Sequence, residues 1–197
     1  MTSPLLLAST SPRRGALLRT AGIAFEALDP GVDDRSEALV AADARASGSG
    51  PEAAVTRVAL FKLLAALPRA RAGQPLLAAD TAVVLDGDLL GKARDRAEAA
   101  AVLGRLRGRT HEVLTGVALL GRSGRLQAAA ARSLVRFTAF APGALEAYLD
   151  SEQWRGKAGA YGLQDPAAAP LVEDVEGSRS NVIGLPLELL SAMLGGP

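Results

Sequence analysis

Near its N-terminus the chain reads LLLASTSPRR, residues 5–14, and this stretch sets the first expectation for the fold. The short apolar run 5–8 is typical of a buried strand. Ser or Thr before Pro is a common helix start, because Pro suits the first helical position. We therefore predict a strand, a short polar loop and then a helix over 13–21 that ends at Gly22.

Strands and helices alternate along the rest of the chain. Further strands are predicted at 23–28, 76–80, 82–85, 113–120, 126–140 and 171–175, of which 76–80 and 82–85 could form one bent strand. Further helices are predicted at 51–67, 95–106, from Pro142 onward and at 185–194. Residues 29–50 are acidic and end in Ser-Gly-Ser-Gly, so we expect a mobile loop with a short helix. The alternation predicts an α/β or α+β protein with a mixed sheet. Without repeats or long linkers, we expect a single domain over residues 1–197.

The composition excludes several classes of function. With 22 basic and 21 acidic residues the net charge is +1, which gives no general attraction to nucleic acid polymers or membranes. An aromatic content of 4% argues against base-stacking platforms, and the lack of cysteine excludes disulfides and thiolate metal sites. No apolar segment approaches the length of a membrane span and no signal-like segment opens the chain, so we expect a cytoplasmic protein.

Lysine and asparagine are scarce in this chain. Only three of the 22 basic residues are Lys, at positions 62, 92 and 157, and the only Asn is at 181. A chain that favours Arg this strongly should keep Lys mainly where the wide guanidinium fork cannot replace a compact point charge. The scarcity therefore marks Lys62, Lys92, Lys157 and Asn181 before any motif is considered.

The residues after the first strand suit an anion. Backbone N–H groups and the dipole at a helix N-terminus favour negative charge. The hydroxyls of Ser9 and Thr10 and the guanidiniums of Arg13 and Arg14 add donors that match phosphate. This segment alone is equally compatible with an ordinary helix cap followed by two solvated arginines.

Other candidate side chains follow strands and glycines. Asp80 ends an apolar strand, where α/β proteins place ligand groups, and could hold Mg²⁺ or orient a water; a turn-capping Asp is the alternative. For Lys92, after a predicted hairpin, and Lys62, within a helix, the alternatives are a surface lysine and a snorkelling lysine. Gln164 ends a glycine-rich stretch, 156–164, whose backbone could approach a ligand while the amide reads a base edge.

Two further polar residues are given structural roles. Asn181 lies in a polar turn before the last helix, and we interpret it as a helix cap. His111 is the sole histidine and has no accompanying nucleophile elbow, so we expect a strand residue with ordinary hydrogen bonds. The P-loop, GxGxxG and HExxH signatures are absent from the sequence.

Taken together, these segments resemble the Maf family of nucleoside triphosphate pyrophosphatases, also called septum-formation inhibitor proteins. The resemblance covers about residues 5–190. It rests on motifs in the right order: LASTSPRR at 7–14, the acidic pair Asp33-Asp34, Lys62 in its helix, AADTAVVLDGDLLGK at 78–92, GRTHEVLTGVAL at 108–119, KAGAYGLQ at 157–164 and EGSRSNVIGLPL at 176–187. The segments THEVLTGVAL and AGAYGLQ look like those of the subgroup that prefers dTTP and UTP.

The resemblance implies a fold, an assembly and a site. The fold would be an elongated, bent mixed sheet flanked by helices, with two lobes and a central cleft, similar to inosine triphosphate pyrophosphatases and usually homodimeric. Basic and hydroxyl side chains would hold the triphosphate: Ser9, Arg13, Arg14, Lys62 and Lys92. Asp80 would be the main catalytic carboxylate, Asp34 would help to bind a divalent metal, Mg²⁺ or Mn²⁺, and Gln164 would contact the substrate.

Two positions depart from the family pattern. The second member of the acidic pair is usually Glu and is Asp34 here, which affects the expected metal geometry. The residue after the Gln is usually Gly and is Asp165 here, which affects the loop on the substrate side.

The implied reaction releases a nucleoside monophosphate and pyrophosphate. It needs charge neutralisation and in-line positioning, so Arg, Lys, a metal and a carboxylate suffice without cysteine or histidine. Two alternatives remain open. One is a nucleotidyltransferase, which also begins with a strand, a loop and an early Arg. The other is a non-catalytic, nucleotide-sensing regulator of cell division.

Overall fold

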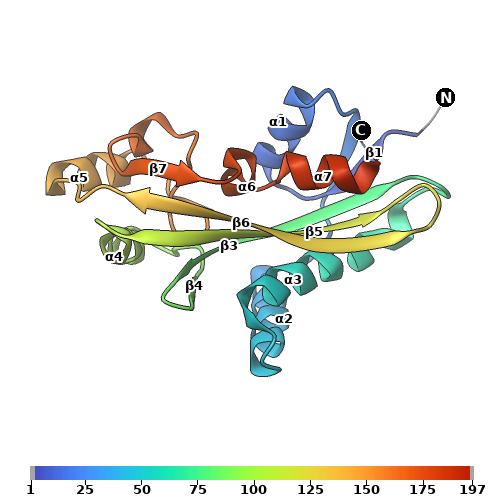
Figure 1. Ribbon diagram of the computed structural model, residues 1–197, viewed down its shortest axis with the longest axis horizontal. Helices are drawn as coiled ribbons and strands as arrows, with labels where there is room; N and C mark the ends of the chain where they lie inside the picture. The colour runs from blue at the N-terminus through green and yellow to red at the C-terminus, as the bar shows by residue number, and fades with distance from the viewer. Residues whose placement is uncertain (1–2, 196–197) are drawn as a thin grey trace. The chain divides into compact units, whose positions relative to one another are not determined.

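The computed structural model describes residues 3–195 and contains seven strands and seven α-helices within them (Figure 1). The strands are β1 (Leu5–Ala8), β2 (Phe25–Leu28), β3 (Leu76–Leu85), β4 (Asp88–Leu90), β5 (Thr110–Leu120), β6 (Leu126–Phe137) and β7 (Val172–Glu176). The α-helices are α1 (Pro12–Thr20), α2 (Asp34–Ala46), α3 (Gly50–Ala66), α4 (Arg96–Leu106), α5 (Pro142–Asp150), α6 (Arg179–Ile183) and α7 (Leu187–Leu194). Short 3-10 helices occupy 67–69 and 166–168.

The strands form one mixed sheet, which confirms the predicted fold class. Their order is β2-β1-β3-β5-β6-β7, with β4 paired to β3. β1 runs parallel to both β2 and β3, whereas the β3–β4 and β6–β7 pairs are antiparallel. No helix within residues 3–195 has the length and apolar character needed to cross a bilayer.

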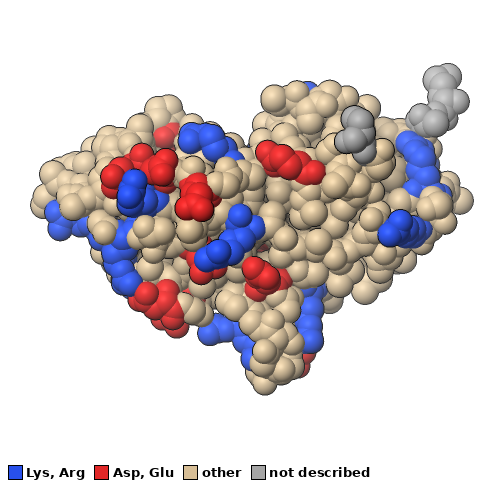
Figure 2. Space-filling view, in the orientation of Figure 1, with Lys and Arg blue, Asp and Glu red and all other residues tan. Residues whose placement is uncertain are grey.

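Contacts divide the chain into two compact units. The first comprises residues 1–80, 115–131 and 184–197, and the second comprises 81–114 and 132–183. Each unit has apolar clusters of its own. Acidic and basic side chains are interspersed over the visible surface, so any binding of an anion must depend on a local group of donors (Figure 2).

In the first unit, β1 is buried on both faces. Leu5 and Leu7 pack in a cluster with Leu18 of α1 and Leu190 of α7. The alternate residues of β1 instead join a cluster with Ala59 and other residues of α3. Because successive side chains of a strand point to opposite faces, a strand covered by helices on both sides must be apolar throughout. This explains why the run 5–8 shows no polar alternation.

Gly116 of β5 allows α3 to lie very close to the sheet in the same unit. A Cβ atom at this position would lie 2.4 Å from the backbone carbonyl of Val55 and 2.6 Å from the backbone nitrogen of Thr56. Such distances are far inside van der Waals contact, and the obstructing atoms are backbone. Only glycine fits between this strand and this helix.

Residues 34–46 form a helix of 13 residues, α2, where the sequence predicted a loop with only a short helix. Asp33 caps this helix, because its side chain accepts a hydrogen bond of 2.7 Å from the backbone N–H of Ser36. The same hydrogen bond lowers the pKa of Asp33. Asp34 and Glu37 then lie in the first turn, where negative charge is favourable to the helix dipole. The acidic residues therefore mark a helix start and not a solvated loop.

The second unit is built around aromatic side chains. Trp154, Tyr148 and Phe137 are almost completely buried in one cluster with the apolar face of α4. Asp95 caps α4 by accepting a hydrogen bond of 2.8 Å from the backbone N–H of Glu98. This unit carries the glycine-rich stretch that ends at residue 164.

Candidate active site

The loop between β1 and α1 brings Ser9 and Arg14 together. The Nη1 atom of Arg14 donates to Ser9 Oγ over 3.0 Å, and its Nε atom donates to the carbonyl of Gly184 over 2.8 Å. Burial lowers the pKa of Arg14, and the negative charges of Asp80 and Glu37 counteract part of this shift. Because arginine remains protonated in proteins, Arg14 is a fixed, half-buried positive charge.

The N-terminus of α1 does not have the side-chain cap that the capping alternative requires, whereas anion binding there remains a prediction. The helix begins at Pro12, as predicted, but the side chain of Ser11 makes no capping hydrogen bond. The backbone N–H of Ser11 donates instead to Ser9 Oγ over 3.2 Å. Arg13 is half-buried in the first turn, next to Arg14. Two guanidiniums and the positive end of the helix dipole therefore lie at the end of β1.

Lys62 lies between two carboxylates. Its Nζ atom is 2.7 Å from Asp80 Oδ1 and 2.9 Å from Glu37 Oε2. Only 9% of the Lys62 side chain is exposed, and the two acidic side chains are 19% and 18% exposed. One ammonium between two carboxylates leaves a local charge of −1, which the nearby charge of Arg14 balances. Lys62 is thus neither a surface lysine nor a snorkelling one.

The side-chain periodicity of β3 and of α3 explains why Asp80 and Lys62 lie together. In β3, Leu76 and Ala78 face the cluster on the α3 side, so Asp80, two residues further, points the same way. In α3, Ala59 joins that cluster, so Lys62, three residues on, lies on the same helix face. Asp80 therefore lies in the middle of β3 and does not end the strand as the sequence predicted, because β3 continues without a break to Leu85. The Lys62–Asp80 pair follows directly on the apolar cluster between β3 and α3.

Glu37 was not predicted as a site residue, whereas Asp34 was. Asp34 is the first residue of α2 and is exposed, and Glu37, one turn later, is the α2 carboxylate in contact with Lys62. A signal for Glu37 exists in the sequence: if Asp33 caps a helix, Glu37 follows Asp34 at the i, i+3 spacing of one helix face. The role of Asp34 in metal binding remains a prediction.

The carboxylates fit a metal that is bound mainly through its substrate. Within residues 3–195, no three His, Asp or Glu side chains gather as a ready-made metal site. Asp80 and Glu37 offer two carboxylates at Lys62. Mg²⁺ commonly takes only one or two protein carboxylates and completes its shell with waters and phosphate oxygens. The donor set therefore suits a cation that arrives with a triphosphate.

A cavity of about 370 Å³ opens beside the loop between β1 and α1, within the size range of small-molecule sites. The hydroxyl-bearing loop residues 9–11 line it together with Phe25 and Leu28 of β2. The polar groups of residues 9–11, which follow β1, are therefore accessible to a small molecule through this cavity.

Lys92 and Gln164 belong to the second unit. The glycine-rich stretch that ends at Gln164 makes backbone contacts with the segment around Lys92. Lys92 forms an isolated antiparallel bridge with Ala158, and the N–H of Gly159 donates to the carbonyl of Gly91 over 3.1 Å. Both Lys92 and Gln164 are exposed. The glycine-rich stretch is therefore tied along its backbone to the segment that carries Lys92.

Gly159 is required for this arrangement. Its φ angle is +66°, and a Cβ atom there would lie 2.7 Å from a methyl group of Val83. The glycine at this position therefore serves close packing on Val83, and an approach of this backbone to a ligand remains a prediction.

Asn181 and His111 both have structural roles. Asn181 is buried, and its Nδ2 donates to the carbonyl of Val113 and to Ser133 Oγ, each over 3.0 Å. It therefore joins α6 to two strands, and the predicted capping role is wrong. His111 lies 2.8 Å from the Tyr161 hydroxyl, in agreement with the expected strand histidine. Burial lowers the pKa of His111 to about 4, so it is neutral at pH 7.

The sequence similarity to known proteins extends over nearly the whole chain. A dTTP/UTP pyrophosphatase of Burkholderia pseudomallei is 45% identical over 193 residues, which cover 95% of this chain and 90% of that protein. A dTTP/UTP pyrophosphatase of Symbiobacterium thermophilum is also 45% identical, over 190 residues, covering 96% and 92%.

Two solved structures share the fold. The Ham1 protein of Coxiella burnetii superposes with a TM-score of 0.52 at 19% identity and covers 99% of both chains. The Ham1 protein of Staphylococcus aureus gives a TM-score of 0.53 at 15% identity and covers 98% of both chains. The model of the family described as Maf-like protein matches residues 4–196. With this match and relatives at 45% identity, the chain belongs to the Maf family.

Proposed function

We propose that the chain hydrolyses nucleoside triphosphates, with dTTP and UTP preferred, to the nucleoside monophosphate and pyrophosphate. The observation that carries this proposal is the largely buried Lys62–Asp80 contact of 2.7 Å, close to the charge of Arg14 at the end of β1. The names of the relatives, dTTP/UTP pyrophosphatases, support the substrate class.

The side chains of the first unit supply what the reaction needs. The oxygen of a water forms a bond to the α- or β-phosphorus, and the bond from that phosphorus to the oxygen bridging the α- and β-phosphoryl groups breaks. The bridging oxygen keeps the electron pair and leaves as part of the other product. Asp80 orients the water and accepts its proton. Ser9, Arg13 and Arg14 hold phosphoryl oxygens, and they neutralise the charge that develops on them. Lys62 fixes the Asp80 carboxylate and adds a positive charge next to it.

Mg²⁺ or Mn²⁺ is the proposed cofactor. Asp80 and Asp34 are its proposed ligands, and Glu37 joins them because its carboxylate shares Lys62 with Asp80. A divalent cation bound there would neutralise phosphate charge and favour attack at phosphorus. The protein's own contribution is to present these carboxylates on rigid elements, α2 and β3.

The second unit contributes substrate contacts in this proposal. Lys92 provides a further positive charge for the triphosphate, and Gln164 contacts the nucleobase through its amide. The backbone bridge between Lys92 and Ala158 supports these two roles, because it links Lys92 to the glycine-rich stretch that ends at Gln164. Homodimeric assembly and a cytoplasmic location, both expected from the sequence, complete the proposal and can be checked by sedimentation and by cell fractionation.

A product assay tests the function. The purified chain is incubated with each nucleoside triphosphate and Mg²⁺ or Mn²⁺ in ¹⁸O-labelled water, with Asp80→Asn as the control. We expect monophosphate and pyrophosphate, and the labelled product identifies the phosphorus attacked. A diphosphate with orthophosphate would contradict the proposal. Nucleotide transfer to an added acceptor would favour a transferase, and tight binding without turnover would favour a sensor.

A further inference from the structure

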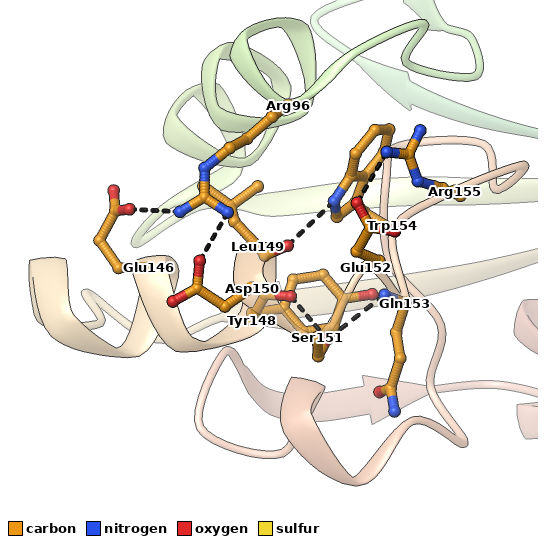
Figure 3. Close-up of polar contacts among 10 residues, drawn as sticks. All are labelled: Arg96, Glu146, Tyr148, Leu149, Asp150, Ser151, Glu152, Gln153, Trp154 and Arg155. Atoms are coloured by element: carbon orange, nitrogen blue, oxygen red, sulfur yellow. Dashed lines mark hydrogen bonds and ion pairs between the residues drawn. The ribbon is translucent and has the colours of Figure 1, made fainter.

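The Gln164 loop is defined as residues 156–165. Several contacts hold the segment that directly precedes this loop (Figure 3). Trp154 is buried, and its Nε1 donates to the carbonyl of Leu149 over 3.2 Å. The guanidinium of Arg155 lies over the Trp154 ring, 4.4 Å from the centroid, and forms an ion pair of 2.7 Å with Glu152. The loop therefore begins from a fixed segment of the second unit.

A largely buried ion pair closes the loop on itself. Lys157 Nζ contacts Asp165 Oδ2, and each of these side chains is only 10% exposed. The hydroxyl of Tyr148 donates to the same Asp165 oxygen over 3.1 Å, and the Asp165 N–H donates to the carbonyl of Gly162 over 3.0 Å. Because Lys157 lies near the start of the loop and Asp165 at its end, the ion pair ties the two ends together.

The backbone of the loop packs directly on this ion pair. A Cβ atom at Gly162 would lie 2.5 Å from Asp165 Oδ2 and 2.9 Å from Lys157 Nζ. A larger residue there would require the Asp165 carboxylate and the Lys157 ammonium to shift. The path of the chain from Gly162 to Gln164 therefore depends on where the two charged groups are held.

Such a pair adds little net stability, because removing two charges from water offsets most of their attraction. Its clearer effect is geometric, since a short contact between two buried charges permits few arrangements. Gln164 directly precedes Asp165 and is exposed, whereas the Asp165 side chain points into the interior. Fixing Asp165 thus fixes the backbone that carries the Gln164 amide.

A fixed backbone limits the positions from which the Gln164 amide can reach a base, and an amide limited in this way can discriminate between bases that a mobile amide would accept equally. Glutamine has a carbonyl acceptor at one position and an NH₂ donor at the other. Uracil and thymine present an O4 acceptor where cytosine presents an N4 donor. A freely rotating amide can match either pattern, whereas an amide held in one orientation matches only one.

We propose that the Lys157–Asp165 ion pair positions Gln164 and thereby sets the preference among pyrimidine nucleoside triphosphates. This rests on the proposed function, and it adds Lys157 and Asp165 as positioning residues that touch neither the phosphates nor the water.

Asp165 and Gln164 should then be energetically coupled in substrate selection. Values of kcat and KM for UTP and CTP are measured for wild type, Asp165→Asn, Gln164→Ala and the double variant. We expect Asp165→Asn to raise KM for UTP about tenfold, with a smaller change in kcat, and to reduce the UTP:CTP ratio of kcat/KM. In the Gln164→Ala background the same change should alter that ratio by less than about twofold, because coupled positions are not additive.

Glu152→Gln is the matched control, because it breaks an exposed ion pair just before the same loop. We expect it to leave the UTP:CTP ratio unchanged. If Asp165→Asn leaves the ratio unchanged, or alters it equally in both backgrounds, the positioning role is overturned, since Asp165 would then affect stability alone. A wild type that forms no monophosphate contradicts the proposed function instead. The cycle is then repeated on the Kd values of UTP and CTP, where absent binding or absent coupling overturns the positioning role.

The double variant Lys157→Met/Asp165→Asn covers the case in which Asp165→Asn does not fold. It removes both charges and so leaves no buried ammonium without a partner. We expect it to fold, to lose the same discrimination and to show faster hydrogen exchange at residues 160–165. Unchanged exchange together with an unchanged UTP:CTP ratio would overturn the proposal.

Discussion

Lys62 and Asp80 are separated by 18 residues in the sequence, yet Lys62 Nζ lies 2.7 Å from Asp80 Oδ1. The contact joins the buried face of α3 to the middle of β3. It holds one oxygen of the Asp80 carboxylate against the ammonium, and it supplies the ammonium with one of its two acidic partners.

Asp80→Asn is expected to lower kcat by about 10²–10⁴ with little loss of stability. Asparagine cannot accept the proton of the attacking water. The fold should survive because Glu37 still neutralises Lys62. Steady-state kinetics and thermal unfolding of the purified variant test both parts. Activity close to that of wild type in a folded variant would remove Asp80 from the mechanism.

Glu37→Gln is expected to weaken metal activation more than Asp34→Asn does. Glu37 contacts Lys62 and lies near Arg14, whereas Asp34 is exposed at the start of α2. The measurement is the Mg²⁺ concentration that gives half the maximal rate, which we expect to rise about tenfold for Glu37→Gln. A larger rise for Asp34→Asn would reverse this order and make Asp34 the principal α2 ligand.

Lys92→Arg is expected to lower kcat/KM although the charge is retained. A crowded triphosphate site can accept a compact ammonium and reject the wider guanidinium fork, and a loss of about tenfold would be a typical size. Arg94→Lys, two residues away on an exposed side chain, is the matched control and should change little. Equal efficiency of Lys92→Arg and wild type would show that the scarcity of lysine carries no information at this position.

His111 is expected to make the protein less stable as the pH falls from about 6.5 to 4. Its pKa in the folded chain is about 4, below the ordinary 6.5, so the unfolded chain binds the proton more readily. The stability from the neutral ring is complete above pH 6.5 and declines by about 3 kcal/mol on reaching pH 4. Denaturant unfolding of wild type and His111→Gln at pH 7.5, 6 and 5 measures the difference. Parallel pH dependences would be inconsistent with a buried neutral histidine.

The sequence predicted most elements of the fold because their patterns are local. The run Leu5–Ala8 is apolar since both faces of β1 are covered, and Pro12 begins α1 as expected. The helix α2 was underestimated because its cap, Asp33, is one of several adjacent acidic residues that resemble a solvated loop.

The site was predicted less completely because its contacts are not local. Lys62 and Asp80 were both selected from the sequence, but their direct contact depends on how α3 packs against β3. Glu37 was missed, because its place next to Lys62 depends on where α2 begins, and the sequence predicted only a short helix somewhere within residues 29–50. Asn181 was assigned to a cap, since burial between β5 and β6 leaves no trace in the residues around it.

Gly116 contacts no reactive group, yet activity should depend on it because it sets how closely α3 approaches the sheet. Val55, against whose carbonyl Gly116 packs, precedes Lys62 by seven residues, which is about two turns of α3. A methyl group at 116 would push that helix outward and carry the ammonium away from Asp80. In a comprehensive mutational scan scored by turnover, position 116 should therefore tolerate as few residues as position 80. Second-site changes that restore activity should fall along α3, where a smaller side chain could let the helix return.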